Sequence, residues 1–185
     1  MAQAAVVPRG EFVEFPVEAI EQLISDRFEQ QVDRFSDRIA VNTGGDELTY
    51  AELDDWANRI ASAILARRGE GEEPVGLLLG QGASAIAAIL GVLKAGKIYV
   101  PLDPSYPLAR LAHMLDWAGA GVVATDSMNA ELAGSLIGDR GHLLVVDHLG
   151  DVGDGGRLGL PASPDAVAYV FFTSGSTGTP KGVFD

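Results

Sequence analysis

The sequence predicts an α/β fold in which helices cover both faces of a parallel β-sheet. Segments with helical periodicity alternate with short segments that are apolar at nearly every position. Strands that are apolar throughout are buried on both faces, as in a parallel sheet between two layers of helices. The 185 residues and their 47% hydrophobic content suffice for one domain with its own core.

The first expected helix spans 17–35, where apolar residues recur every three or four positions. We expect its buried stripe to consist of Ile20, Ile24, Phe28, Val32 and Phe35. A short strand is expected to follow at 38–43.

The second expected helix begins near Thr49. Thr49 and Glu52 have the spacing of a capping box, and Gly69 stands where the C-terminal cap is expected. Its buried stripe is expected to consist of Leu53, Trp56, Ile60 and Ile64. An aromatic side chain at this spacing is typical of a core, so we assign Trp56 no functional role.

Strands and helices alternate through the rest of the chain. Strands are expected at 74–79, 97–103, 120–126, 142–147 and 167–172, and helices at 83–96, 106–119 and 129–138. The five strands are expected to form the parallel sheet, joined by the helices and by a loop at 148–166. In such sheets ligands bind beyond the carboxyl ends of the strands, so the loop after the last strand is expected at a functional edge.

Composition excludes several classes of function. The net charge of −13 and the lack of a Lys/Arg stripe argue against a nucleic-acid partner. With no cysteine and only three histidines, disulfides and thiolate metal sites are excluded and a His-based metal site has little support. No apolar run approaches the roughly 18 residues of a membrane span, and the first residues do not resemble a secretory leader. We therefore expect a cytoplasmic protein with no membrane partner.

Three glycine-containing segments are candidates for phosphate contact, and the first is 91–98, GVLKAGKI. It fits the P-loop pattern through Gly96 and Lys97, but Ile98 stands where a Ser or Thr hydroxyl would reach a magnesium ion. A helix precedes it and a strand follows, which inverts the order of a P-loop. We interpret this segment as a helix C-cap leading into a strand.

The second candidate has the order of a dinucleotide-binding fingerprint. Gly80, Gly82 and Ala85 follow an apolar strand in a G-x-G-x-x-A pattern, and Asp103 ends the next strand, where an acid can bind a ribose hydroxyl. Short Gly-x-Gly turns are also common between strands and helices, and the prolines around Asp103 favour a rigid turn. A plain scaffold role therefore remains as the alternative.

The third candidate is TSGSTGTPKG, residues 173–182. Glycines allow backbone N–H groups to turn toward an anion, hydroxyls add donors, and Lys181 adds a positive charge. A polar surface loop has the same composition. Composition alone leaves both interpretations open.

The stretch YVFFTSGSTGTPKGV, residues 169–183, resembles the phosphate-binding signature of the AMP-forming adenylating enzymes. This superfamily comprises acyl-CoA synthetases, luciferases and the adenylation domains of nonribosomal peptide synthetases. The segment 48–65 is similar to the family's first core motif, and 93–126 is similar to its second, in the form typical of peptide synthetases. The resemblance covers the chain from about Ile20 to Val183 and implies that Gly80, Gly82 and Asp103 are scaffold.

The resemblance implies an ATP-dependent ligase that activates a carboxylic acid, with an amino acid favoured by the form of the second motif. The acid attacks the α-phosphorus of ATP to give an acyl-adenylate, and a carrier protein's phosphopantetheine thiol then takes the acyl group. The loop would hold the β- and γ-phosphates through Thr173, Ser174, Gly175, Ser176, Thr177, Gly178 and Lys181. Mg²⁺ is expected to come with ATP, with its protein ligand outside this chain. No catalytic residue is assigned, since no His lies near Ser174 or Ser176 in the sequence to activate them.

Family members are longer and carry the acid pocket, the adenine and ribose contacts and a small C-terminal domain downstream of this loop. We therefore expect residues 1–16 to be an N-terminal extension, and 17–185 to be the first α/β subdomain of an adenylation domain, cut after its phosphate loop. Such a chain is expected to be inactive alone and to need a complementary downstream portion. The alternatives are a noncatalytic remnant or interaction module with the same fold, and an NAD-binding domain.

Overall fold

A computed structural model describes residues 16–149, 155–160, 163–174 and 180–184. The helices are α1 (Ile24–Phe35), α2 (Tyr50–Arg68), α3 (Ala83–Lys94), α4 (Leu108–Ala118) and α5 (Ala130–Ile137). The strands are β1 (Ile39–Asn42), β2 (Glu47–Thr49), β3 (Pro74–Leu78), β4 (Ile98–Leu102), β5 (Val122–Thr125), β6 (His142–Val145), β7 (Val170–Ser174) and β8 (Pro180–Phe184). Short 3-10 turns lie at Val17–Ile20, Gly138–Arg140 and Val146–His148.

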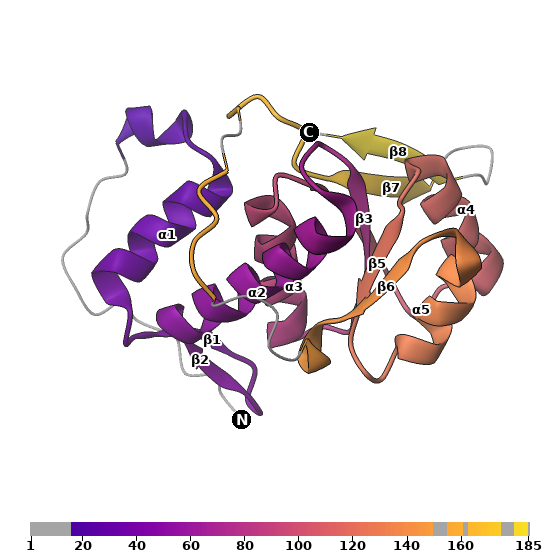
Figure 1. Cartoon of the computed structure of the whole chain (residues 1–185), viewed down its shortest axis with the longest axis horizontal. Helices are drawn as coiled ribbons and strands as arrows, with labels where there is room; N and C mark the ends of the chain where they lie inside the picture. Colours follow the sequence, from indigo (N-terminus) through magenta and orange to yellow (C-terminus); the bar gives the residue numbers. More distant parts are fainter. Residues whose placement is uncertain (1–15, 150–154, 161–162, 175–179, 185) are drawn as a thin grey trace.

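A four-stranded parallel sheet with the order β4-β3-β5-β6 forms the centre of the molecule. Helices α2 and α3 cover one face, and α4 and α5 cover the other (Figure 1). Each face has its own cluster of buried side chains, with Val75 and Leu77 on the α2/α3 side and Leu78 and Val100 on the α4/α5 side. The predicted fold class, a parallel sheet between two helical layers, is therefore confirmed.

Helix α2 begins and ends as its sequence predicts. The Thr49 hydroxyl accepts a hydrogen bond from the Glu52 N–H at 3.2 Å, and the Glu52 carboxylate accepts one from the Thr49 N–H at 2.8 Å. Gly69 caps the other end with a φ of 68° and donates its N–H to the Leu65 carbonyl. The Trp56 indole N–H donates to the Val146 carbonyl at 2.8 Å, which ties α2 to the end of β6 and fits a core role.

Helices α2 and α3 approach each other closely at Gly91. A Cβ atom at Gly91 would lie 2.6 Å from Cγ2 of Ile60 and 2.9 Å from the carbonyl oxygen of Ala57. Such distances leave no room for a side chain, so the interhelical contact depends on glycine at this position.

The first helix differs from its prediction. It begins at Ile24, and Ile20 lies in the preceding 3-10 turn with 67% of its surface exposed. Val32 is buried and Phe28 packs against the α2/α3 core, but Ile24 is exposed. The predicted stripe is therefore wrong at its first two positions, because the helix is shorter than its apolar periodicity suggests.

Ion pairs attach α1 to the body of the domain. The buried ammonium of Lys94, at the end of α3, contacts Glu29 of α1 and Asp54 of α2, the latter at 2.9 Å. Arg157 reaches Asp33 of α1 at 2.7 Å from the segment that follows β6. These ion pairs hold α1 in place together with the apolar contacts of Phe28 and Val32.

The last predicted strand is also corrected. We expected 167–172 to be the fifth parallel strand, and Tyr169 does form a parallel bridge with Tyr99 of β4, with the Tyr99 N–H donating to the Ala168 carbonyl at 3.0 Å. Strand β7 itself begins at Val170 and pairs antiparallel with β8. An antiparallel partner only a short loop away is available without a crossover helix, which favours the hairpin.

A smaller hairpin was not predicted from the sequence. Strand β1, expected at 38–43, pairs antiparallel with β2, which ends at Thr49, the N-cap of α2.

In the part of the chain that the structure describes, no helix is long and apolar enough to cross a membrane.

Gly91→Ala is expected to destabilise the domain by about 1–3 kcal/mol, since the new methyl group overlaps Ile60 and the backbone of α2. Gly134→Ala in α5 is the matched control, because a Cβ there meets only Leu143 Cδ2 at 3.9 Å. We expect the control to gain up to about 1 kcal/mol through helix propensity. Urea unfolding measures the free energy of unfolding of both variants. A Gly91→Ala protein as stable as the Gly134→Ala control would contradict the close packing of α2 and α3.

Candidate functional site

The candidate site lies at the closed end of the β7–β8 hairpin. Thr173 pairs with Lys181 and Ser174 pairs with Pro180 across the two strands. Side chains of directly opposite residues lie on the same face, with Cβ atoms about 4.5–5.5 Å apart. The Thr173 hydroxyl and the Lys181 ammonium therefore flank one end of the intervening loop from the same side.

The structure describes only part of the predicted phosphate-binding set. Thr173, Ser174 and Lys181 belong to the two strands. The remaining members lie outside the described residues: Gly175, Ser176, Thr177 and Gly178. Their assignment stays a prediction, and the hairpin fixes the two points between which this loop runs.

Lys181 is the exposed member of the three lysines in the sequence. Lys94 and Lys97 are both buried, and each forms an ion pair with a carboxylate. The Lys181 side chain is exposed at the end of the hairpin. In a chain with a net charge of −13, this exposed ammonium is suited to attract an anionic ligand.

The inner face of the hairpin packs on α4. The rings of Phe172 and Trp117 meet edge to face with centroids 5.4 Å apart. A Cβ atom at Gly182, the residue opposite Phe172, would collide with the Trp117 ring. The last turn of α4 therefore fixes the position of the hairpin, and Gly182 is required for the close approach.

The residues of the dinucleotide fingerprint hold loops at the carboxyl edge of the sheet. The Gly80 N–H donates to Oδ2 of Asp126 at 3.3 Å, which places a carboxylate where a pyrophosphate would need the free N–H. Asp103 accepts from the Ser105 N–H at 2.9 Å within its own turn, and these contacts with Ser105 lower the pKa of Asp103. The contacts favour the scaffold interpretation.

The P-loop-like segment 91–98 is a helix end. Gly96 has a φ of +65°, and its N–H donates to the Leu93 carbonyl at 3.0 Å. Lys97 then points into the interior and the strand β4 begins at Ile98. This agrees with the C-cap interpretation of the sequence.

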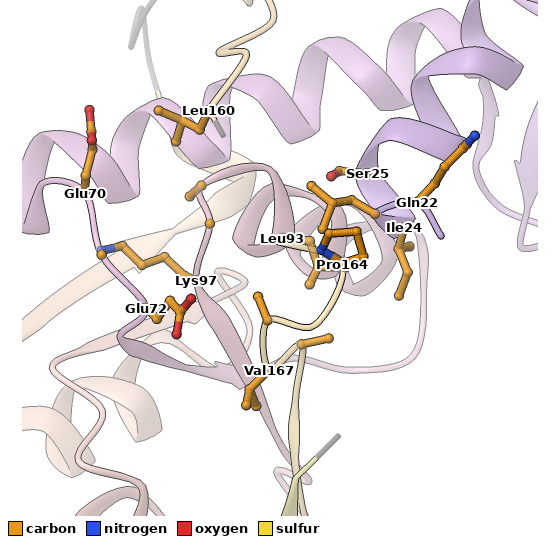
Figure 2. Close-up of a pocket in the computed structure, with 16 residues that line it drawn as sticks. Gln22, Ile24, Ser25, Glu70, Glu72, Leu93, Lys97, Leu160, Pro164 and Val167 are labelled. Atoms are coloured by element: carbon orange, nitrogen blue, oxygen red, sulfur yellow. The ribbon is translucent and has the colours of Figure 1, made fainter. Parts of the chain in front are cut away.

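A cavity of about 320 Å³ lies near the amino ends of β3 and β4 (Figure 2). Its apolar walls include Leu23, Leu93, Leu160, Pro164 and Val167, and its polar lining includes Glu70, Glu72 and Lys97. It contains none of the predicted phosphate-binding residues, and two carboxylates at its wall disfavour a nucleotide phosphate.

Lys97 forms a buried ion pair beside this cavity. Its ammonium, which solvent does not reach, contacts Oε2 of Glu73 at 2.8 Å, while the Glu73 side chain is 39% exposed. The hydrogen bond from Lys97 lowers the pKa of Glu73, and a contact from Arg68 at 2.9 Å acts in the same direction. The pair has a local structural role at the start of β3 and β4.

Among the described residues, no group of three or more His, Asp or Glu side chains could hold a metal ion.

Strand β8 and the contact with Trp117 were not predicted from the sequence. Apolar residues flank a short Gly-containing loop at 175–179, which is a hairpin signal that could have predicted β8. Nothing in the sequence links Trp117 to Gly182, which lie far apart along the chain and meet only in the fold.

Comparison with known proteins gives one family match. Residues 28–184 match the AMP-binding enzyme family. The phosphinothricin tripeptide synthetase PhsC of Streptomyces viridochromogenes is 45% identical over 161 residues, which are 84% of this chain and 14% of PhsC. Tyrocidine synthase 1 of Brevibacillus parabrevis is 36% identical over 160 residues, which are 86% of this chain and 15% of the synthase. The chain thus spans a small part of the relatives that it matches.

Solved structures agree with these matches. The AMPPNP-bound form of the nonribosomal peptide synthetase FmoA3 is 35% identical and superposes with a TM-score of 0.80, over 92% of this chain and 18% of FmoA3. The N-terminal subdomain of Klebsiella oxytoca NpsA in complex with 3-hydroxybenzoyl-AMSN is 25% identical, with a TM-score of 0.74 over 88% of this chain and 40% of that subdomain.

The buried Lys97–Glu73 pair predicts an asymmetric response to substitution. Glu73→Gln leaves the buried Lys97 ammonium without its carboxylate and is expected to cost about 1–3 kcal/mol, since solvent screens the 39% exposed Glu73. Lys97→Met leaves Glu73 partly solvated and in contact with Arg68, so we expect a change within about 1 kcal/mol. Equal losses in denaturant unfolding at neutral pH would contradict this account.

The pH dependence of the same pair has a definite sign. Because the folded-state pKa of Glu73 lies below its ordinary value of 4.5, the pair stabilises the fold above that pH and loses this effect as the pH falls through the folded pKa. The free-energy difference between the wild-type protein and Glu73→Gln is therefore expected to shrink in acid.

Gly182→Ala is expected to loosen the hairpin, because the new methyl group collides with the Trp117 ring. Amide hydrogen exchange in β7 and β8 should become about tenfold faster, which corresponds to a local loss of about 1.4 kcal/mol. In a Trp117→Ala background the same substitution should have little further effect. Additive effects of the two substitutions would show that the residues do not interact.

Proposed function

The chain belongs to the AMP-binding enzyme family, and from this membership we propose that it provides the phosphate-binding hairpin of an ATP-dependent adenylating ligase. The carboxylic acid substrate is activated as acyl-AMP and transferred to a carrier-protein thiol. The chain corresponds to the N-terminal portion of nonribosomal peptide synthetase adenylation domains. An amino acid substrate is favoured by the peptide synthetases among its relatives.

One observation carries the proposal, namely the opposition of Thr173 and Lys181 at the base of the loop 175–179. A short loop of Ser, Thr and Gly between two fixed strands can direct several N–H and O–H donors at one anion. The ammonium at its base adds a charge that a net-negative protein needs to attract ATP. The AMPPNP-bound FmoA3 structure supports ATP as the nucleotide.

In the proposed reaction a carboxylate oxygen of the acid attacks the α-phosphorus of ATP. The bond from the α-phosphorus to the bridging oxygen breaks, and pyrophosphate leaves with the electron pair. Donors from Thr173, Ser174, Gly175, Ser176, Thr177 and Gly178, together with Lys181, would hold the β- and γ-phosphates as this charge develops. The hairpin therefore contributes orientation and electrostatic stabilisation, and none of its residues exchanges a proton with the acid.

The reaction also requires groups that hold the acid, the adenine and the ribose. The matched parts of FmoA3 and NpsA are 18% and 40% of those chains. We therefore propose that a complementary portion of the adenylation domain supplies these groups, and that a carrier protein receives the acyl group. This chain without that portion is expected not to exchange pyrophosphate into ATP.

Lys181→Ala is expected to weaken the binding of AMPPNP about fivefold, because an exposed ion pair contributes on the order of 1 kcal/mol. Arg140→Ala is the matched control, since it removes an exposed cation that pairs with Asp116 elsewhere on the surface. Isothermal titration of the full chain measures both. If both variants bound AMPPNP equally weakly, the effect of Lys181 would come from the net charge of the protein and not from a contact with the phosphates.

The same titration separates the alternatives. Tighter binding of NAD than of AMPPNP, lost in Gly80→Ala, would favour the dinucleotide-binding alternative. If neither nucleotide binds, even after the downstream portion is added, the noncatalytic remnant is favoured.

A further inference from the structure

The cavity near the amino ends of β3 and β4 has the features of a second binding site. It is formed by the start of α1, the loop between α2 and β3, the end of α3 and the segment that leads into β7. Its volume of about 320 Å³ lies at the lower end of the range for small-molecule sites. Neither Thr173 nor Lys181 lines it, so it is separate from the hairpin of the proposed function.

Most of the cavity wall is apolar. Leu93, Pro164 and Val167 contribute hydrocarbon side chains (Figure 2). Lys97 adds its aliphatic stem, since its ammonium is bound to Glu73 and solvent does not reach it. The apolar body of a ligand would leave water on contact with this wall, which favours binding. The cavity therefore fits a ligand with a compact apolar body.

A buried hydroxyl lies at one wall of the cavity. Ser25, in the first turn of α1, is only 7% exposed and lines the cavity (Figure 2). Its hydroxyl forms no hydrogen bond with a described residue. Buried polar groups are usually paired, and a hydroxyl can both donate and accept a hydrogen bond. A hydrogen-bonding group of a ligand would supply the partner that Ser25 lacks.

The charge at the cavity is negative. Glu70 and Glu72 line it, and neither forms an ion pair with a described residue. In Figure 2 the Glu72 side chain lies near that of Lys97, on the wall across from Ser25. The charge of Lys97 is already balanced by Glu73. A carboxylate without an ion pair beside an apolar wall attracts a cation and repels an anion.

We propose that this cavity binds a small apolar molecule that carries an amine. The amine is protonated at neutral pH and donates to the Glu72 carboxylate. The apolar body packs against Leu93 and Val167, and a hydroxyl at the far end of the ligand pairs with Ser25. Because these contacts come from α1, the α2–β3 loop, α3 and the segment before β7, the site selects for charge, apolar bulk and length together.

Tyramine is the probe for this site, because it has an ammonium at one end of an apolar body and a phenol hydroxyl at the other. Tyrosol has a neutral hydroxyl in place of the ammonium, and hydroxyphenylpropionate has a carboxylate. Amide NMR titration of the full chain measures the three affinities from shifts at Gly71, Gly96 and Ala168, which line the cavity. For tyramine we expect a dissociation constant on the order of 1 mM, because the ligand has few atoms.

Tyramine is expected to bind about fivefold more tightly than tyrosol, which is the effect of one partly solvated ion pair. Glu72→Gln should remove this preference. Glu131→Gln is the matched control, since it removes an exposed carboxylate from α5 and should leave the preference unchanged. Ser25→Ala should weaken tyramine and tyrosol equally, by about threefold, because both carry the phenol hydroxyl.

Equal binding of tyramine and tyrosol would overturn the proposal, as would binding of none of the three probes. These comparisons use the wild-type protein, so they do not depend on the stability of the variants. An equal effect of Glu72→Gln and Glu131→Gln would attribute the preference to net charge and would also contradict the site.

The amine site and the phosphate hairpin are tested separately. Lys181→Ala should leave the affinity for tyramine unchanged, and saturating AMPPNP should not displace tyramine. Displacement by AMPPNP, with tyramine shifts concentrated at 173–182, would place the amine at the hairpin and contradict a separate site. Failure of AMPPNP to bind would contradict the proposed function and leave the result for tyramine unaffected.

Discussion

The rest of the structure depends on the burial of β3 between β4 and β5. Its backbone pairs on both sides, from Val75 to Leu78, and both of its faces are covered by helices. At Gly76 a Cβ atom would lie 2.7 Å from Leu115 Cδ2, which shows how closely α4 approaches this strand. With β3 in the interior, β4 and β6 are the edge strands, and the chain after the long loop lies beside β4, where Tyr169 bridges Tyr99. The position of the hairpin follows from this arrangement.

The hairpin is attached to the rest of the fold on both of its faces. A bridge joins Tyr99 to Tyr169, Val170 is buried in the core cluster on the α4/α5 side, and the rings of Phe171 and Phe172 contact those of Tyr99 and Trp117. Binding loops are commonly held in place by a rigid scaffold of this kind. The arrangement of the lysines also favours anion binding at the hairpin. Lys94 and Lys97 are buried in ion pairs, whereas Lys181 is exposed.

Local patterns predicted the parts of the fold that local forces determine. Short-range chemistry determines both ends of α2, namely the capping box of Thr49 and Glu52 and the C-cap at Gly69. Burial on both faces gives the four strands of the parallel sheet their apolar sequences, so these strands could also be predicted.

The first helix was predicted too long, because apolar periodicity cannot show whether Ile20 and Ile24 are covered by another part of the chain, and both are exposed. The parallel approach of 167–172 to the sheet is limited to the bridge between Tyr99 and Tyr169, and the antiparallel pairing of β7 with β8 was missed, since an apolar strand can pair in either direction. Within the candidate site, residue chemistry and family resemblance indicated Thr173 and Lys181, while their cross-strand opposition and the support from Trp117 required the fold.

The most direct test of the account is a backbone amide NMR titration of the full chain with AMPPNP. We expect chemical-shift changes concentrated at 173–182 and spreading to Trp117 through its contact with the hairpin. Shifts concentrated instead at Gly80 and Gly82, or around the cavity near Lys97, would contradict the assignment of the hairpin as the nucleotide phosphate site.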